Sequence, residues 1–170
     1  MSNTASTMTP PLGLAAAVPA LPALLGLTGV GVGIYSFVSP YDAIRKFGLR
    51  NSSPAKGSDS AHMEAFQRSV IYGYGIRNVG VGLANLGLVA YWRFSPECRV
   101  SPVAALIVQK CLGVCLLAGT VVGLGDAWIM RQFAKEEGVV GEAESDASKA
   151  SVGHGVTAIL IFATGLFLFV

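Results

Sequence analysis

Four apolar stretches, each long enough to cross a lipid bilayer as a helix, constrain this chain more than any other feature. They cover residues 21–38, 70–92, 103–129 and 152–170. A helix needs about 20 mostly apolar residues to span the hydrocarbon of a membrane. Hydrophobic residues make up 52% of the chain and charged residues only 13%, whereas about 25% are charged in ordinary soluble domains. The sequence therefore predicts an all-α, polytopic membrane protein whose single domain, residues 21–170, is a four-helix transmembrane bundle.

The segment that precedes the first stretch, residues 1–20, is predicted to be a flexible N-terminal tail. It contains no Lys or Arg, and the first charged residue of the chain is Asp42. A secretory signal peptide begins with a positively charged region and has a shorter apolar core. We therefore expect residues 21–38 to remain in the protein as a membrane span.

The Lys and Arg residues of the connections predict an orientation. The first and third connections together hold eight of these residues, and the second holds two, Arg93 and Arg99. Cytoplasmic loops carry the excess of Lys and Arg. The first and third connections are therefore predicted to be cytosolic and both termini lumenal, in the endoplasmic reticulum or another endomembrane. One feature disagrees, because the glycosylation sequon at Asn51 would require the first connection to be lumenal.

Two connections carry patterns of their own. In YDAIRKFGLR, residues 41–50, the apolar Tyr41, Ile44 and Phe47 recur every third residue beside two basic residues. This pattern predicts a short interfacial helix that lies against lipid headgroups. The third connection, KEEGVVGEAESDASKAS, is small, polar and acidic, and is predicted to be a flexible cytosolic loop.

Several classes of partner and cofactor are disfavoured by the composition. The formal net charge is only +2, without a basic face, so nucleic acid is not expected as a partner. The three cysteines have neither disulfide-framework nor zinc spacing, and no metal site is predicted. The run Gly73-x-Gly75 has Asn78 where a dinucleotide-binding loop has its third glycine, and no strand precedes it. We expect no cofactor.

Glycines and other small residues recur at helical spacing in three of the stretches. In the second stretch, one face carries small residues around Arg77, and the adjacent face is polar. Small residues let neighbouring helices approach closely in a membrane, where apolar association gains little. These stripes are therefore predicted to be helix-packing seams. Their members are Gly73, Gly80, Ala84 and Gly87 in the second stretch, Gly26, Gly29, Gly33 and Ser36 in the first, and Gly119 and Gly123 in the third.

Arg77 is the most unusual residue of the second stretch because it is a charge well inside a predicted span. Such a charge costs at least about 2.5 kcal/mol and normally faces a partner or a wet cavity. Asp126 of the antiparallel third stretch and His154 of the fourth belong to the same side of the membrane. We predict a polar cluster of Tyr74, Arg77, Asn78, Asp126 and His154, with Asn85 on the polar face of the same helix. Two interpretations stay open: a structural ion pair that fixes helix register, or a functional site.

Three segments carry a resemblance to a known family: SPYDAIRKFGLR after the first stretch, GIRNVGVGL in the second and LGDAW closing the third. Over about residues 24–170 the chain resembles a family of small four-helix membrane proteins that is common in fungi. That family is catalogued as a domain of unknown function and is found partly beside secondary-metabolite genes. Its most specific element is matched by Gly75, Arg77, Asn78 and Gly82. Residue 78 is often acidic in the family, so Asn78 weakens any role for this position as an acid or base.

Together these features suggest a membrane-embedded isomerase or cyclase that tailors a lipophilic secondary metabolite such as an epoxide, enol or polyene. Such chemistry needs a proton donor and acceptor in a dry pocket. Asp126 is the expected acid or base, His154 its relay and Arg77 the stabiliser of negative charge, while Tyr74, Asn78 and Asn85 would bind substrate. One alternative is a non-catalytic scaffold or assembly subunit that forms a homo-oligomer or joins a partner membrane enzyme. Another is a small transporter or channel subunit.

Overall fold

The structure, a computed structural model, describes residues 18–49 and 58–170. Within these ranges it contains six helices and no strand, which confirms the predicted all-α class. Most of the predicted tail, residues 1–17, and the sequon at Asn51 lie outside the described residues.

Four long helices make up the bundle. Their bounds are Ala20–Val38 (α2), Ser58–Phe94 (α4), Pro102–Phe133 (α6) and Glu142–Phe169 (α7). In the described part of the chain, α2, α6 and α7 are long and apolar enough to cross a membrane. The 37-residue α4 is not among these three, because Arg77, Asn78 and Asn85 lower its average hydropathy. Three apolar helices thus identify an integral membrane protein.

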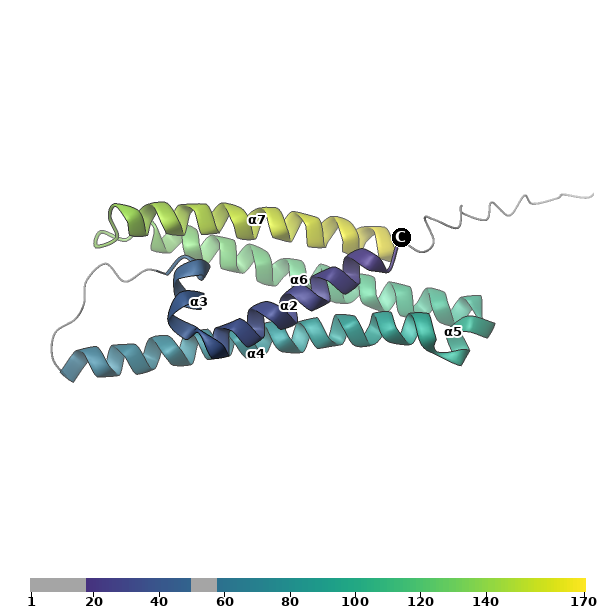
Figure 1. Ribbon diagram of the computed structural model, residues 1–170. Helices are drawn as coiled ribbons and strands as arrows, with labels where there is room; N and C mark the ends of the chain where they lie inside the picture. The colour runs from purple at the N-terminus through teal and green to yellow at the C-terminus, as the bar shows by residue number, and fades with distance from the viewer. Residues whose placement is uncertain (1–17, 50–57) are drawn as a thin grey trace, which may run out of the picture.

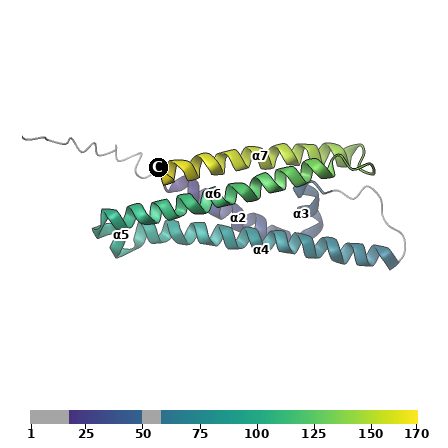
Figure 2. The same ribbon diagram turned by 180° about the vertical axis from the view of Figure 1, so that it is seen from behind.

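The long helices are arranged as two close pairs, α2 with α4 and α6 with α7 (Figure 1). The short helix α5, Pro96–Val100, joins α4 to α6 at one end of the molecule. From there α4 and α6 separate towards the opposite end, where the short helix α3, Pro40–Phe47, lies between α4 and α7. Figure 2 shows the same arrangement from behind.

Backbone-to-backbone approach holds α2 against α4. A Cβ atom placed on Gly33 would lie 2.5 Å from Cγ2 of Val79 and 2.6 Å from the carbonyl oxygen of Gly75. One placed on Gly82 would lie 2.6 Å from the carbonyl oxygen of Gly26. Only hydrogen fits at these positions. The predicted small-residue stripe of α2 is therefore a packing seam.

The prediction that Gly73, Gly80 and Gly87 form the packing seam of α4 was wrong. Gly73, Gly80 and Gly87 are exposed, and a Cβ atom on any of them would meet nothing within 4 Å. The face that packs is instead that of Gly75 and Gly82. Both faces of α4 carry small residues at helical spacing, so the choice depends on the partner: the glycines of α2 receive Val79 only if α4 turns Gly75 and Gly82 towards them.

Helices α6 and α7 also approach each other closely through glycines, but not at the predicted positions, Gly119 and Gly123. A Cβ atom on Gly113 would lie 2.9 Å from the carbonyl oxygen of Gly165, and one on Gly165 would lie 3.0 Å from that of Gly113. Of the predicted motif, a Cβ atom on Gly123 would lie 3.0 Å from that of Ala158, whereas one on Gly119 would have only Cγ2 of Ile161 within 4 Å, at 3.9 Å. The closest approach therefore lies nearer the C-terminus of α7.

Helix α3 forms where the sequence predicts it and ends at Gly48, whose φ of 103° is left-handed and is tolerated best by glycine. Part of its apolar side packs inside the molecule. Ala43 and Ile44 are buried against Ile71 of α4. A Cβ atom on Gly48 would lie 2.6 Å from that of Ala150 on α7. The helix thus connects the two pairs at the end opposite α5.

The third connection is shorter than predicted, because residues 142–151 form the beginning of α7 rather than a loop. Ala143 and Ala147, one turn apart, are buried, and Glu142 and Glu144 occupy the first turn, where negative charge is favourable. The segment is therefore helical despite its loop-like composition, because its alanines pack against the rest of the molecule.

Candidate functional site

A cavity of about 290 Å³ lies between the two helix pairs. Residues of all four long helices line it. All six residues proposed from the sequence as a site are among them, namely Tyr74, Arg77, Asn78, Asn85, Asp126 and His154. The predicted polar cluster therefore surrounds one space.

Arg77 and Asp126 form an ion pair across this cavity. Nη2 of Arg77 donates to Oδ2 of Asp126 at 2.8 Å. The Asp126 side chain is 9% exposed and the Arg77 side chain 38% exposed. Because Arg77 belongs to the α2–α4 pair and Asp126 to the α6–α7 pair, the bond links the two halves of the bundle. The partnership inferred from their positions in the sequence is present.

The Arg77 guanidinium also lies over the ring of Tyr74, with its Cζ 5.0 Å from the ring centroid. This contact holds the cation by its attraction to the aromatic face. Nδ2 of Asn78 donates to the backbone oxygen of Tyr74 at 2.8 Å. One amide N–H of Asn78 is therefore bonded within its own helix.

His154 borders the end of the cavity that is nearest α3. The ring of Phe47 lies edge-on to the imidazole, with the centroids 5.1 Å apart, and 4.6 Å from the ring centroid of Tyr74. Phe47 thus bridges α4 and α7 beside the polar cluster. The sequence placed Phe47 on an interfacial helix and did not assign it to the site, because its two contact partners lie in distant segments, α4 and α7.

Two buried polar atoms on cavity-lining residues have no hydrogen-bond partner among the described residues. They are Nε of Arg77 and Oδ1 of Asn85. Asn85 is only 4% exposed. Buried polar groups are satisfied in the large majority of cases. The two atoms are therefore exceptions within the described part of the chain, and neither has appreciable accessible surface towards the cavity.

The remaining lining is apolar or small. It includes Leu25, Gly29, Val81, Gly82, Leu116, Gly119, Val122, Gly123 and Ile161. Sequence reasoning did not assign these residues to the site. The sequence does contain a pattern that indicates some of them. Residues 115, 119 and 122 of α6 recur at helical spacing and share one helix face with Asp126. A cavity of this lining suits a lipophilic molecule with few polar groups.

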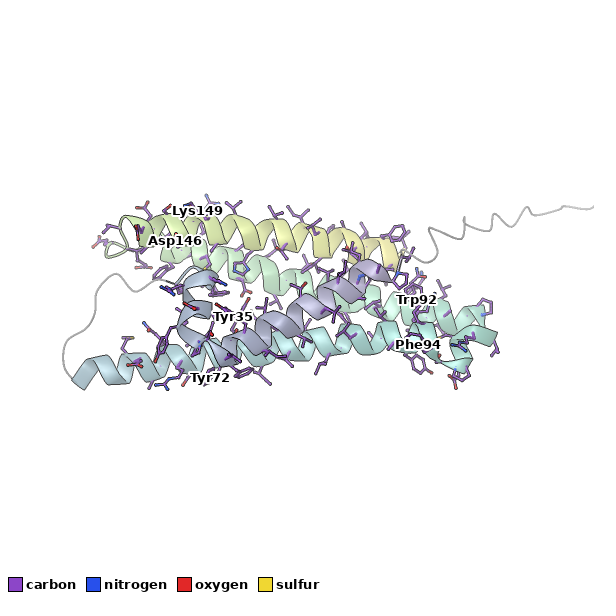
Figure 3. The ribbon with its side chains drawn as sticks, viewed as in Figure 1. Tyr35, Tyr72, Trp92, Phe94, Asp146 and Lys149 are labelled. Carbon is purple, nitrogen blue, oxygen red and sulfur yellow. The ribbon has the colours of Figure 1, made fainter. Side chains whose placement is uncertain are left out.

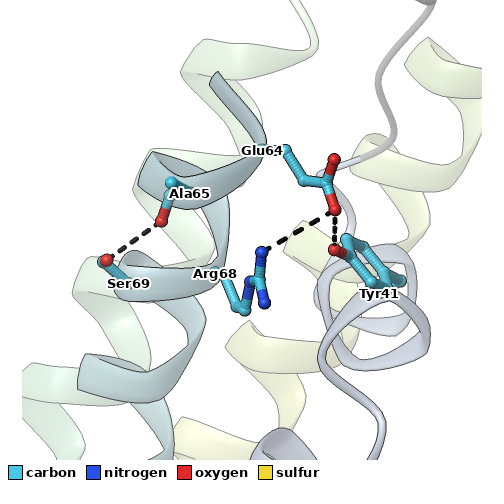
Figure 4. A network of polar contacts seen from close by, with 5 residues as sticks. All are labelled: Tyr41, Glu64, Ala65, Arg68 and Ser69. Carbon is cyan, nitrogen blue, oxygen red and sulfur yellow. Dashed lines mark hydrogen bonds and ion pairs between the residues drawn. The ribbon is translucent and has the colours of Figure 1, made fainter. Parts of the chain in front are cut away.

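At the α3 end of the bundle, a second polar network ties α3 to α4 (Figure 4). The Tyr41 hydroxyl donates to Oε1 of Glu64, and Nη2 of Arg68 lies 3.8 Å from the same oxygen. The pKa of Tyr41 is raised above its ordinary value, first because its hydroxyl donates to the Glu64 carboxylate. This network fixes the position of α3.

Metal ligands are not gathered in the described part of the chain. No three His, Cys, Asp or Glu side chains there lie close enough together to hold a metal ion. Cys98 is buried, Cys111 and Cys115 are exposed, and all three are free thiols.

Comparison with known proteins identifies a family but no activity. Neither a curated protein nor a solved structure matches the chain. A family model, described as a domain of unknown function (DUF4267), matches residues 26–168, which include α4, α6, most of α2 and α7, and every residue of the polar cluster. The chain is thus a member of the DUF4267 family.

Proposed function

We propose that this protein is a cofactor-independent isomerase or cyclase that acts on a lipophilic small molecule inside the membrane. The observation that carries the proposal is the cavity itself, in which a buried carboxylate, a guanidinium and an imidazole face one mostly apolar space. Perturbed and paired ionisable groups in a water-poor cleft are typical of catalytic sites. The substrate class is an epoxide, enol or polyene of secondary metabolism, a class suggested by the fungal distribution and gene context of the family that the chain resembles.

In the proposed mechanism, Asp126 moves the proton. Its carboxylate accepts a proton from a carbon next to a carbonyl or epoxide, and the same proton returns to a different atom of the product. Arg77 hydrogen-bonds the oxygen on which negative charge develops, and such preorganised donors contribute the largest share of many rate enhancements. His154 relays the proton, and Tyr74 and Asn78 orient the substrate. Atoms and electrons balance without an oxidant or a second substrate.

For the cavity to lie inside the bilayer, α4 must be a fourth span, and its aromatic residues support this. Tyr72 lies within the first half of α4, and Trp92 lies near its C-terminal end (Figure 3). They are 20 residues apart in sequence, which is about 30 Å of helix, close to the thickness of the hydrocarbon. Trp and Tyr favour the two membrane interfaces. Arg77 then lies about 7.5 Å inside the Tyr72 interface, where the Asp126 partner and cavity compensate its charge.

The orientation follows from the Lys and Arg counts of the connections. The α3 end, with the α6–α7 connection, faces the cytosol, and α5 and both termini face the lumen of the endoplasmic reticulum or another endomembrane. Helix α3 then lies at the cytosolic interface, where Arg45 and Lys46 reach lipid headgroups.

A second candidate function is a non-catalytic assembly subunit. It is favoured by the small-residue face of α4, where Gly73, Gly80 and Gly87 are exposed and have nothing beside them. Such a face permits close approach of another helix, from a second copy or from a partner enzyme. This function would not require the carboxylate of Asp126. Loss of a co-purifying partner in a Gly80→Leu variant would favour it.

The experiment that tests the catalytic proposal is deletion of the gene followed by metabolite profiling. We expect an intermediate to accumulate, and we expect the wild-type gene but not Asp126→Asn to restore its conversion. Thr120→Val, which alters a buried hydroxyl of α6 that bonds its own helix at 3.2 Å, is the matched control and should restore conversion. Full turnover in microsomes by both Asp126→Asn and Arg77→Ala would exclude the mechanism.

A further inference from the structure

We propose that Gly119 of α6 is a specificity-determining residue of the cavity. Because this position has no side chain, the cavity admits a lipophilic ligand whose apolar body is broad, either branched or cyclic. A larger residue there would restrict the cavity to straight-chain molecules. The inference rests on the proposed function only in taking the cavity as the site of a lipophilic ligand. It adds the shape of that ligand and the residue that selects it.

Four of the residues that line the cavity are glycines, and three of these are required by helix packing. A Cβ atom on Gly29 would lie 3.2 Å from the backbone oxygen of Asn78, and one on Gly82 would lie 2.6 Å from a backbone oxygen of α2. A Cβ atom on Gly123 would lie 3.0 Å from that of Ala158. At these three positions the space for a side chain is therefore taken by a neighbouring helix.

Gly119, the fourth of these glycines, has open space beside it. Among the described residues, a Cβ atom there would have only Cγ2 of Ile161 within 4 Å, at 3.9 Å. Gly119 also lacks the positive φ that favours glycine, and inside a helix glycine is less favourable than alanine. Neither packing nor backbone conformation therefore requires glycine at this position. The space beside it belongs to the cavity.

A leucine at position 119 would lie within the cavity. Long side chains on a helix point back towards its N-terminus, over the residues three and four positions earlier. For position 119 these residues are Leu116 and Cys115, and both line the cavity. The cavity volume of about 290 Å³ is close to the lower end of the range of about 300–1,000 Å³ for ligand sites. One added side chain would therefore exclude a ligand that is broad at this level.

Beside Gly119 the cavity reaches the outer surface of the bundle. Cys115 and Val122, which precede and follow Gly119 on one face of α6, line the cavity and are exposed. The same holds for Val81 of α4, which is 43% exposed. Because α6 is long and apolar enough to cross a membrane, this surface faces lipid. A ligand dissolved in the bilayer therefore reaches the cavity at the level of Gly119.

Gly119 is remote from the residues that are proposed to move the proton. It precedes Asp126 by seven positions on the same helix face, which is about 10.5 Å along the helix. Arg77 is bonded to Asp126 at that distant level. A substitution at position 119 therefore changes the shape of the cavity and leaves the ion pair in place. Its effect on ligand shape can be measured without turnover.

The test uses the full chain in lipid nanodiscs and two ketone probes, straight-chain decanone and fused bicyclic decalone. The two ketones have the same number of carbon atoms and the same oxygen function, so they differ mainly in breadth. Binding is measured by calorimetric titration, with protein-free nanodiscs as the blank because both ketones partition into lipid. The protein variants are wild type, Gly119→Leu, Gly119→Ala and Gly125→Leu.

Gly125→Leu is the matched control. Gly125 belongs to the same helix, and a Cβ atom on it would meet nothing within 4 Å among the described residues. It is not one of the described residues that line the cavity. The two leucine variants therefore make the same chemical change on α6, and only the one at position 119 alters the cavity.

We expect wild type and Gly125→Leu to bind both ketones. Gly119→Leu should weaken the binding of decalone by about tenfold or more and that of decanone by less than about threefold, since a straight chain still passes beside the added side chain. Gly119→Ala adds only a methyl group and should weaken the binding of decalone by an intermediate factor.

Melting temperatures separate this role from a role in helix packing. Gly119→Leu should melt at the temperature of wild type or above it, because leucine is the better helix former and meets no neighbouring helix. Gly123→Leu should melt at a lower temperature, because its side chain meets Ala158.

Four results would overturn the proposal. They are a fall in the melting temperature of Gly119→Leu like that of Gly123→Leu, equal affinities of wild type and Gly119→Leu for decalone, the same loss of decalone binding in Gly125→Leu, and failure of wild type to bind either ketone.

The outcome is distinguishable from that of the catalytic proposal. Selective loss of decalone binding in Gly119→Leu, without an accumulating intermediate after gene deletion, would exclude the catalytic proposal and leave the selection by shape standing. An accumulating intermediate that the wild-type gene converts, together with unchanged decalone binding in Gly119→Leu, would do the reverse.

Discussion

Arg77 of α4 and Asp126 of α6 meet at 2.8 Å across the boundary between two separately packed helix pairs. Within each pair the helices touch through glycines, where neither partner has freedom to shift. Between the pairs, the cavity replaces close packing. The ion pair therefore has a mechanical role as well as the proposed chemical one, and the two roles predict different behaviour of variants.

Removing one partner of the pair should destabilise the fold, and removing both should not. We expect Asp126→Leu or Arg77→Met alone to lower the free energy of unfolding by about 2–3 kcal/mol. Breaking a fully buried pair costs about 3–5 kcal/mol. The loss is smaller here because the Arg77 side chain is 38% exposed. The double variant should lie near wild type, since no charge is left unpaired, but it should be inactive. Unfolding by sodium dodecyl sulfate in mixed micelles measures the first quantity. An active double variant would show that the pair is only structural.

Gly33→Ala should separate α2 from α4. The new Cβ atom would lie 2.5 Å from Val79 and 2.6 Å from the backbone oxygen of Gly75, which cannot rotate away. We expect a loss of about 1–3 kcal/mol or more in the same unfolding assay. Gly80→Ala is the matched control, because its Cβ atom would meet nothing within 4 Å, and its stability should remain that of wild type. Equal effects of the two substitutions would contradict the packing described.

Gly48→Ala should weaken the attachment of α3 more than its backbone conformation alone explains. The position has a φ of 103°, and the added Cβ atom would also lie 2.6 Å from that of Ala150. Gly141, with a φ of 68°, a ψ of −126° and open space around it, is a strained position without a close contact. We expect backbone strain to cost about 1–3 kcal/mol in either Gly48→Ala or Gly141→Ala, and the contact with Ala150 to add to this cost only at Gly48. Melting temperatures in nanodiscs compare the two variants.

The contact between Tyr41 and Glu64 should respond to alkaline pH. The pKa of Tyr41 lies above its ordinary value because the neutral hydroxyl donates to the carboxylate. A raised pKa in the folded state means that the contact is fully present below about pH 10 and is lost as the pH rises through the raised value. A phenolate absorbance titration of Tyr41→Phe should lack one late-titrating step that wild type shows. Glu64→Gln should move that step to lower pH, and an unmoved step would refute the assignment.

The proposed orientation is tested by single cysteines in a background without the three native ones. Glu137→Cys, in the α6–α7 connection, and Glu97→Cys, in α5, replace exposed residues at opposite ends of the bundle. We expect a membrane-impermeant maleimide added outside sealed microsomes to label position 137 at once. Position 97 should react only after permeabilisation. The reverse pattern would place the α3 end in the lumen and make Asn51 available for glycosylation.

Much of the site was accessible to sequence reasoning because charges inside apolar helices are few. Arg77 must find a partner, and Asp126 of the antiparallel α6 and His154 of α7 are the ionisable residues at the same depth, so helix geometry brings them together. The prediction that they share a space with Tyr74, Asn78 and Asn85 used only the periodicity of α4.

Some features could not be predicted because the sequence offers two equivalent alternatives and only the packing in the folded protein selects one. On α4, the stripes of Gly73 and Gly80 and of Gly75 and Gly82 have the same composition and spacing, and only the shape of α2 distinguishes them. The start of α7 is polar enough for a loop, but Ala143 and Ala147 find a docking surface. The position of Phe47 beside His154 depends on both outcomes.

The short corner α5 has a consequence for how the two helix pairs are joined. Ser95 caps its start by accepting from the backbone N–H of Cys98, and Ser101 caps the start of α6 by accepting from that of Ala104. At this end the pairs are therefore joined by the chain itself through a capped corner. Towards the other end they are joined by side-chain contacts, namely the packing of α3 and the bond between Arg77 and Asp126. A substitution can remove the second kind of junction and leave the first intact.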